Sequence, residues 1–246
     1  MRMAMISKDV DWRKLGLLLA SLVLIAIFWD SRISYPLRVL VVFFHELSHA
    51  LAAWATGGSV EEISVVKEVG GACVTAGGSR FLILTSGYLG SLAWGGAILL
   101  FAARTRFDRL LMALLGAILI AVSLLFVRPF QGFGFIFGAA SGAVLLALAA
   151  YLPGAANDYL LRVIGLSSTM YAILDLKDDV LDRPGAPSDA RMLAELTGLP
   201  ALVWGLLWMG IALAATLFFL IQVSKARKPA GGIAAIGAMP PRSGGA

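Results

Sequence analysis

The sequence has few of the residues that soluble enzymes use for charge, cross-linking and metal binding. Its 246 residues include one cysteine and two histidines, and only 14% of them are charged. A single cysteine, Cys73, excludes an intrachain disulfide. Because there is no second cysteine and no histidine outside residues 45–49, a zinc cluster built from cysteine and histidine is excluded as well.

Apolar residues are in excess instead. They make up 59% of the chain, and the mean hydropathy is +0.87. A soluble globular chain is about half apolar and about a quarter charged. The composition therefore predicts a polytopic membrane protein. We expect one transmembrane domain over residues 1–222 and a disordered basic tail over residues 223–246, which is rich in Gly, Ala and Pro.

The basic residues lie beside the apolar runs, as Arg13, Lys14 and Lys225 illustrate. Lysine and arginine in such positions typically anchor a protein at the membrane surface. The net charge of +5 is therefore explained by a lipid bilayer as partner, and no nucleic acid is expected. An integral protein of the bacterial inner (plasma) membrane is the expected localisation.

Seven apolar segments predict the helices. They cover residues 15–29, 36–56, 80–103, 109–127, 132–152, 156–176 and 199–222. A span needs about 20 residues, so the short first segment and the more polar sixth one are the weakest candidates. The fold class predicted is all-α, a transmembrane bundle of about six or seven spans. Seven crossings would place the two basic ends on opposite sides, against the positive-inside rule.

Two polar intervals carry structure of their own. Residues 57–79 alternate polar with β-branched residues between glycine pairs, which predicts a short β-hairpin. In the interval 177–198, Ser188 or Asp189 can cap a short helix that ends near Gly198.

The stretch HELSH holds both histidines. On a helix, His45 and His49 share a face and can present their imidazole nitrogens to one metal ion. Glu46 lies at the edge of that face, where it can take a proton from a water on the metal. Zinc suits a site of two histidines, a carboxylate and a water.

The same five residues can also arise by chance on an ordinary helix. Here they lie inside an apolar run, where a charged residue costs about 2.5–3.5 kcal/mol on insertion scales and usually marks function. We therefore favour a metal site over an incidental motif.

A zinc hydrolase needs a third protein ligand, and it must be Asp, Glu or Cys because no histidine is left. Asp175 closes the sixth apolar run and is the predicted ligand, with Asp178 and Asp179 as alternatives. The competing interpretation is a solvated helix end, which needs no metal and accounts well for Asp182.

The sequence resembles the site-2-protease class of intramembrane zinc metalloproteases, in its bacterial peptidase branch. "FFHELSHALAAWATGG" is similar to the HExxH helix of that class, and "GGSVEEISV" to the β-like segment that follows it. "SGYLGS" is similar to the small-residue helix that comes next, and "MYAILDLKDD" to the later helix that carries an aspartate ligand. The likeness covers the order of elements over residues 36–215, and HELSH is its most specific part.

The resemblance implies a bundle with a metal held within the membrane. It implies a zinc-dependent intramembrane endopeptidase that hydrolyses peptide bonds in or near the transmembrane segments of a protein or peptide substrate. In this chain His45 and His49 match the histidine ligands, Glu46 the catalytic base and Asp175 the aspartate ligand. The family aspartate is usually followed by glycine, whereas Leu176 follows Asp175 here.

Two other hypotheses belong to different classes. A catalytically inactive, protease-like scaffold or binding subunit predicts that Glu46→Gln has no effect whereas loss of the whole protein does. A transporter or channel, with His45, Glu46 and His49 lining an ion path, predicts metal flux across vesicles. Residues 80–152 offer few polar side chains for such a path.

Overall fold

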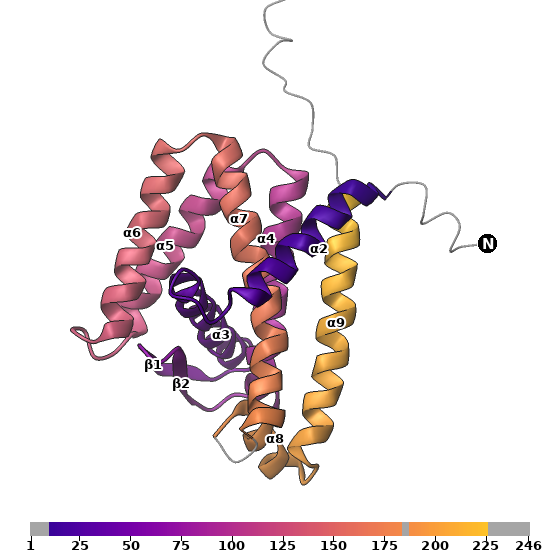
Figure 1. Cartoon of the computed structure of the whole chain (residues 1–246). Helices are drawn as coiled ribbons and strands as arrows, with labels where there is room; N and C mark the ends of the chain where they lie inside the picture. The colour runs from indigo at the N-terminus through magenta and orange to yellow at the C-terminus, as the bar shows by residue number, and fades with distance from the viewer. Residues whose placement is uncertain (1–9, 184–186, 226–246) are drawn as a thin grey trace, which may run out of the picture.

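The computed structural model describes residues 10–183 and 187–225, which form eight α-helices and one two-stranded hairpin (Figure 1). A short π-helical turn, η2 (Asp178–Asp182), continues α7. The predicted helical bundle with a hairpin is confirmed. The elements in chain order are α2 (Trp12–Ile27), α3 (Tyr35–Ala55), β1 (Ser59–Val66), β2 (Gly70–Ala76), α4 (Arg80–Arg104), α5 (Asp108–Phe126), α6 (Phe133–Tyr151), α7 (Gly154–Lys177), α8 (Asp189–Thr197) and α9 (Ala201–Lys225).

Among the described residues, six helices are long and apolar enough to cross a membrane: α3, α4, α5, α6, α7 and α9. The 16 residues of α2 are fewer than the roughly 20 that a span needs. The beginning of α2 and the end of α9 lie at the same end of the bundle (Figure 1), where Arg104 Nη2 donates to Gln222 Oε1 at 3.1 Å. The basic residues Arg13, Lys14 and Lys225 therefore lie at one end of the bundle, as the positive-inside rule favours.

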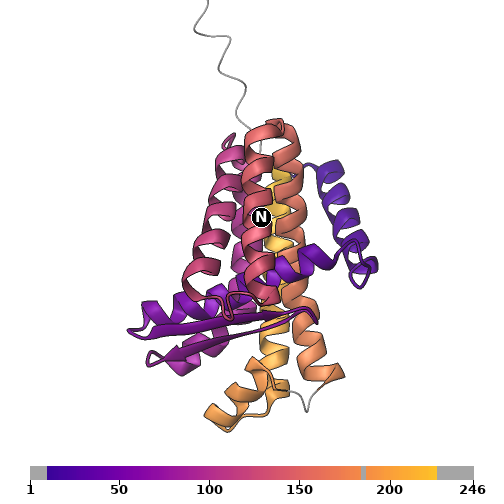
Figure 2. The ribbon, with the colours of Figure 1, turned by 90° about the vertical axis from the view of Figure 1, so that its left-hand side faces the viewer.

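Helix α3 is the most deeply buried of the six candidate spans. It has Pro36 in its first turn, where the missing N–H costs no helical hydrogen bond. Its residues are apolar on nearly every side, which is typical of a helix enclosed by others. Figure 2 shows α3 running across the upright helices, with the hairpin below it. This arrangement places the HELSH residues in the middle of the molecule.

Glycines let the helices pack backbone against backbone. A Cβ built on Gly95 of α4 would lie 2.6 Å from Gly165 O of α7, and one built on Gly116 of α5 would lie 2.7 Å from Gly142 O of α6. Ser168 Oγ also donates across the α4–α7 contact to Ser91 O at 2.7 Å. Small residues drive helix association in membranes because they allow this close approach.

The hairpin lies against α3. Strands β1 and β2 are antiparallel, with Ile63 opposite Cys73 and Val65 opposite Gly71. On the other edge of β1, Ile63 forms a bridge with Val127, and Arg128 N donates to Ile63 O at 3.0 Å. The link between α5 and α6 thus covers β1, whereas β2 has no further strand beside it within the described ranges.

The short helix after α7 begins and ends close to the residues predicted from the sequence. Helix α8 begins after Ser188, whose side chain accepts from Arg191 N, and ends at Gly198 with φ at 75°. Residues 223–225, placed in the tail by the sequence prediction, form the last part of α9. The rest of that predicted tail, residues 226–246, lies outside the described residues.

The close α4–α7 contact makes a prediction about stability. Gly95→Ala should lower the free energy of unfolding by about 1–3 kcal/mol, since the new methyl group meets backbone atoms that cannot move aside. The control is Gly210→Ala on the exposed side of α9, where a Cβ meets nothing within 4 Å; it should be neutral or stabilise by up to about 1 kcal/mol. Thermal unfolding in detergent measures both, and equal effects of the two variants would contradict the packing argument.

Candidate metal centre

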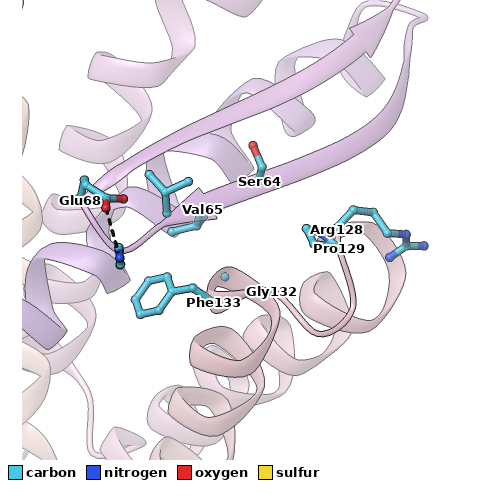
Figure 3. Close-up of a pocket in the computed structure, with 10 residues that line it drawn as sticks. Ser64, Val65, Glu68, Arg128, Pro129, Gly132 and Phe133 are labelled. Carbon is cyan, nitrogen blue, oxygen red and sulfur yellow. Dashed lines mark ion pairs between the residues drawn. The ribbon is translucent and has the colours of Figure 1, made fainter.

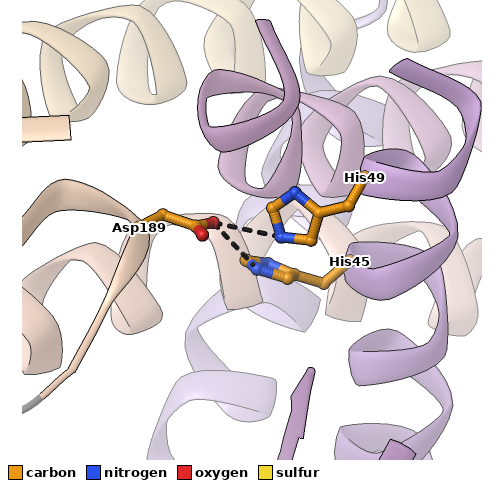
Figure 4. Close-up of side chains that lie close together, drawn as sticks. All are labelled: His45, His49 and Asp189. Atoms are coloured by element: carbon orange, nitrogen blue, oxygen red, sulfur yellow. Dashed lines mark ion pairs between the residues drawn. The ribbon is translucent and has the colours of Figure 1, made fainter. Parts of the chain in front are cut away.

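The two histidines of α3 converge on one carboxylate oxygen. His45 Nε2 and His49 Nε2 each lie 3.2 Å from Asp189 Oδ2, and the two imidazole centroids are 4.8 Å apart. Figure 4 shows both rings reaching from α3 toward Asp189 on α8. The three residues form a buried cluster whose ligand atoms all lie within 4.8 Å of one another.

Asp189 is the first residue of α8, which packs against α4 and α9. Its carboxyl group is 8% exposed. Burial by itself raises the pKa of this carboxyl, but in the metal-free chain the positive charges of protonated His49 and His45 outweigh burial, so the pKa of Asp189 falls below its usual range. The carboxyl group is therefore a carboxylate, the form that binds a metal ion.

The donor set fits a zinc-like ion. Ligand atoms about 2.0–2.2 Å from a tetrahedral ion lie about 3.4 Å from one another, close to the two 3.2 Å separations. Asp189 Oδ2 is buried and has no hydrogen-bond donor among the described residues, a costly state that a bound cation would relieve. A Cβ on Gly87 of α4 would collide with Asp189 Oδ2 and His45 Nε2, so the glycine keeps this space open.

The second nitrogen of His49 has a firm partner. His49 Nδ1 lies 2.7 Å from Ile83 O, and a carbonyl oxygen can only accept, so Nδ1 carries the proton. That tautomer leaves the lone pair of Nε2 free to bind a metal, as is usual for histidine ligands. Ser86 Oγ donates to the same carbonyl at 2.6 Å.

Glu46 lies beside the cluster and beneath the hairpin. It is only 4% exposed. A Cβ on Gly71 of β2 would come within 2.5 Å of Glu46 Oε1, so the strand passes directly over the carboxylate. The glycine at that point of β2 allows the approach. Glu46 therefore lies between the hairpin and α3, the helix that carries both histidines.

Cys73 lies on β2, opposite Ile63. Burial, together with the negative charges of Glu46 and Asp189, raises the pKa of its thiol to about 12. The thiol is therefore protonated at neutral pH in the metal-free chain, and among the described residues Cys73 is not part of the cluster that could hold a metal ion. Cys73 packs against the main core of the bundle, as a small filler residue would.

The comparison with protein families bears directly on this cluster. The profile of the Peptidase M50B-like family matches residues 18–219, a range that contains α3, the hairpin and α8. The chain belongs to this family. Searches among curated proteins and among solved structures found no match.

Membership confirms the resemblance to site-2 proteases and supports a metalloprotease-type function in a membrane. The six apolar helices agree with an integral membrane protein. The cluster of His45, His49 and Asp189 gives this M50B-like chain a group of residues that could hold a metal ion.

The acidic residues predicted as third ligand lie elsewhere in this M50B-like bundle. Asp175 Oδ2 is 3.6 Å from His45 Nδ1, the nitrogen on the other side of the ring from Asp189. Asp179 accepts from Tyr88 Oη at 2.7 Å, and Asp178 is half-exposed beside Lys177. The structure therefore brings Asp189, and none of these three, to the two Nε2 atoms.

Asp189 was missed because a capping role was enough to explain it. An acidic residue in the first turn of a helix is ordinary, since it faces the positive end of the helix dipole. The available signal was its place after Pro184, Gly185 and Pro187, residue types that typically end a helix and precede a new one. Nothing in the local pattern indicates which helix it meets.

One cavity lies away from the metal centre. It has a volume of about 300 Å³ and separates the turn of the hairpin from the α5–α6 link (Figure 3). None of the cluster residues lines it; its walls are Ser64, Val65, Val66, Lys67, Glu68, Arg128, Pro129, Gly132, Phe133 and Gly134. The functional assignment therefore rests on the buried cluster and not on this cavity.

The geometry predicts that Asp189 controls metal binding. Asp189→Asn should weaken the affinity for zinc by more than about 100-fold, beyond the 10–100-fold typical of outer-shell partners, because the charged ligand is lost. Metal content and competition with a chromophoric chelator measure this on the purified chain in detergent. The control is Glu195→Gln on the same helix, whose side chain is 62% exposed and should leave the affinity unchanged. Wild-type affinity in Asp189→Asn would exclude it as a ligand.

Proposed function

We propose that the chain is a zinc-dependent intramembrane endopeptidase that hydrolyses peptide bonds in or near transmembrane segments of other proteins. The observation that carries the proposal is the convergence of His45 Nε2 and His49 Nε2 on Asp189 Oδ2, next to the buried Glu46. Membership in the M50B-like family supports the same chemistry. In this proposal the zinc ligands are His45, His49 and Asp189, with Asp189 in the role that the sequence assigned to Asp175.

Zinc, when bound there, supplies a Lewis acid that polarises a carbonyl group and makes water nucleophilic near neutral pH. Glu46 follows His45 on α3, so its carboxylate is held at the edge of the histidine face. It takes the proton of the attacking water and passes it to the leaving amine. Its burial beneath Gly71 keeps the carboxylate close to the reacting bond and away from bulk water.

The hairpin supports a substrate that binds as an extended strand. Strand β2 crosses Glu46 at Gly71, and its outer edge has no neighbouring strand in the described part of the chain. An unwound segment could add to this edge by main-chain hydrogen bonds and would then pass over the carboxylate. A helix must unwind before its peptide bonds become accessible, so a strand edge at this position favours a transmembrane substrate.

The proposed setting is the bacterial inner membrane, with the lipid bilayer as the surrounding partner. Exposed apolar side chains on α5, α6 and α9, among them Leu125, Ile136 and Leu206, agree with contact to lipid. Fractionation of the expressing cells checks the location, because recovery in the soluble fraction would contradict it.

Glu46→Gln should abolish cleavage without removing the metal. The amide keeps the size of the side chain but cannot take a proton, so we expect the rate to fall by about 10²–10⁴-fold. The assay uses purified chain in detergent, loaded with zinc, and a panel of transmembrane peptides. Glu61→Gln on the exposed face of β1 is the matched control and should cleave at the wild-type rate.

The outcomes separate the proposal from its rivals. A wild-type chain that binds no zinc would overturn the metalloprotease. Equal cleavage by Glu46→Gln and the wild type would remove Glu46 from the chemistry. Zinc at one ion per chain, without cleavage of any peptide, would favour the inactive scaffold.

Val65→Pro tests the strand-addition step. Proline removes one main-chain donor and does not fit a paired strand, and Val65 pairs with Gly71 above Glu46. We expect cleavage of transmembrane peptides to fall at least about tenfold while zinc content stays at the wild-type level. Unchanged cleavage would reject the role of the hairpin in substrate binding and leave the metal chemistry standing.

A further inference from the structure

The two histidine ligands differ in what supports their second nitrogen. His49 Nδ1 has a hydrogen bond of 2.7 Å to Ile83 O. His45 Nδ1 is buried and has no hydrogen-bond partner among the described residues. The carboxylate that faces it is Asp175, whose Oδ2 lies 3.6 Å away. One of the two ligands thus lacks the contact that normally sets its tautomer.

The His45 ring cannot turn away from this carboxylate. Tyr88 of α4 and Tyr171 of α7 both meet it edge-on, with centroid separations of 5.6 and 6.0 Å. Between these rings, one nitrogen points to Asp189 and the other to Asp175. The ring is therefore held with a carboxylate at each of its two nitrogens.

Asp175 is placed where a free carboxylate would be costly. It lies in the last turns of α7, a candidate span, and its side chain is only 18% exposed. The exposed Asp178 and Asp182 that follow it pair with Lys177. Carboxylates within a membrane helix are rare and usually have a specific partner. The partners that the structure offers to Asp175 are the hydroxyl of Tyr171, on the same helix, and His45 on α3.

We propose that Asp175 is a positioning residue for the metal centre, an inference that rests on the proposed zinc site. Asp175 accepts a hydrogen bond from His45 Nδ1–H and thereby fixes the tautomer in which the Nε2 lone pair faces the metal. The two atoms have to close by about 0.7 Å to reach the length of a charge-assisted hydrogen bond. Carboxylate–histidine–metal arrangements of this kind orient the ligand and raise its basicity.

The alternative role, Asp175 as the third ligand, fits the geometry less well. It would require His45 to bind the metal through Nδ1. His45 Nε2 and His49 Nε2 share Asp189 Oδ2 as a common neighbour, which places a single ion at the Nε2 side. Asp175 lies on the opposite side of the ring and is left to hold Nδ1.

Asp175→Asn tests the inference on the full chain in detergent. Loss of the charge should weaken zinc affinity by about 10–100-fold, as measured by chelator competition, while the zinc content at saturation stays at one ion per chain. The matched control is Asp182→Asn, the same substitution at a half-exposed site on η2, which should bind zinc as the wild type does. Thermal unfolding of the zinc-free proteins shows whether any loss comes from misfolding.

Nuclear magnetic resonance gives a readout that a merely structural role would not move. The chain has only two histidines, so ¹⁵N-histidine labelling yields two imidazole spin systems. In the zinc-loaded wild type we expect both Nδ1 atoms to be protonated. In Asp175→Asn the Nδ1–H signal of His45 should move upfield, and that of His49, bonded to Ile83 O, should stay.

The following results would each decide against the positioning role of Asp175 or against the proposed function. Unchanged zinc affinity and an unchanged His45 signal in Asp175→Asn would overturn the positioning role and leave the zinc protease intact. A His45 ring that is protonated at Nε2 in the zinc-loaded wild type would overturn it without any variant. Zinc retained in Asp189→Asn but lost in Asp175→Asn would make Asp175 the ligand. A wild type without zinc would instead defeat the proposed function itself.

Discussion

The structure depends on one contact: two imidazoles of α3 meet one carboxylate of α8 inside an apolar bundle. The surrounding elements hold these three side chains together. Polar groups in a membrane interior cannot form hydrogen bonds with water, so each needs a partner within the protein. The surroundings of the cluster come from separate elements. Ile83 O of α4 accepts from His49, Asp175 of α7 faces His45 Nδ1 at 3.6 Å, and α8 carries Asp189. The cluster is thus the place where α3, α4, α7 and α8 are made to meet.

Small residues allow these helices and the hairpin to approach one another closely. Gly87 leaves room beside His45 and Asp189, and Gly71 leaves room above Glu46. Gly95 and Gly165 bring α4 and α7 into backbone contact, and the same two helices carry Tyr88 and Tyr171, which meet the His45 ring edge-on. Gly87, which looks like an ordinary packing residue in the sequence, therefore also leaves the space that the candidate metal centre occupies.

The hairpin joins the metal centre to the outside of the bundle. Its first strand is covered by the α5–α6 link through Ile63 and Val127, whereas the second strand lies over Glu46 with one edge open in the described part. In the proposed function, chemistry and substrate access are thereby supplied by different elements. The helices would hold the ligands, and the two-stranded element would offer the edge at which an extended peptide is bound.

The sequence by itself determined the helices, the hairpin, the short helix from Asp189 to Gly198 and the metal-binding face of HELSH. Each of these depends on contacts between near neighbours: apolar runs of about 20 residues, alternation bounded by glycine, and a spacing of four on one helix. Only the tertiary structure decided which carboxylate completes the cluster. Asp175 and Asp189 are both acidic residues near the end of the same region, and local rules cannot distinguish them. The choice depends on where α7 and α8 lie relative to α3, which brings Asp189 to Nε2 of both histidines and leaves Asp175 facing Nδ1 of His45.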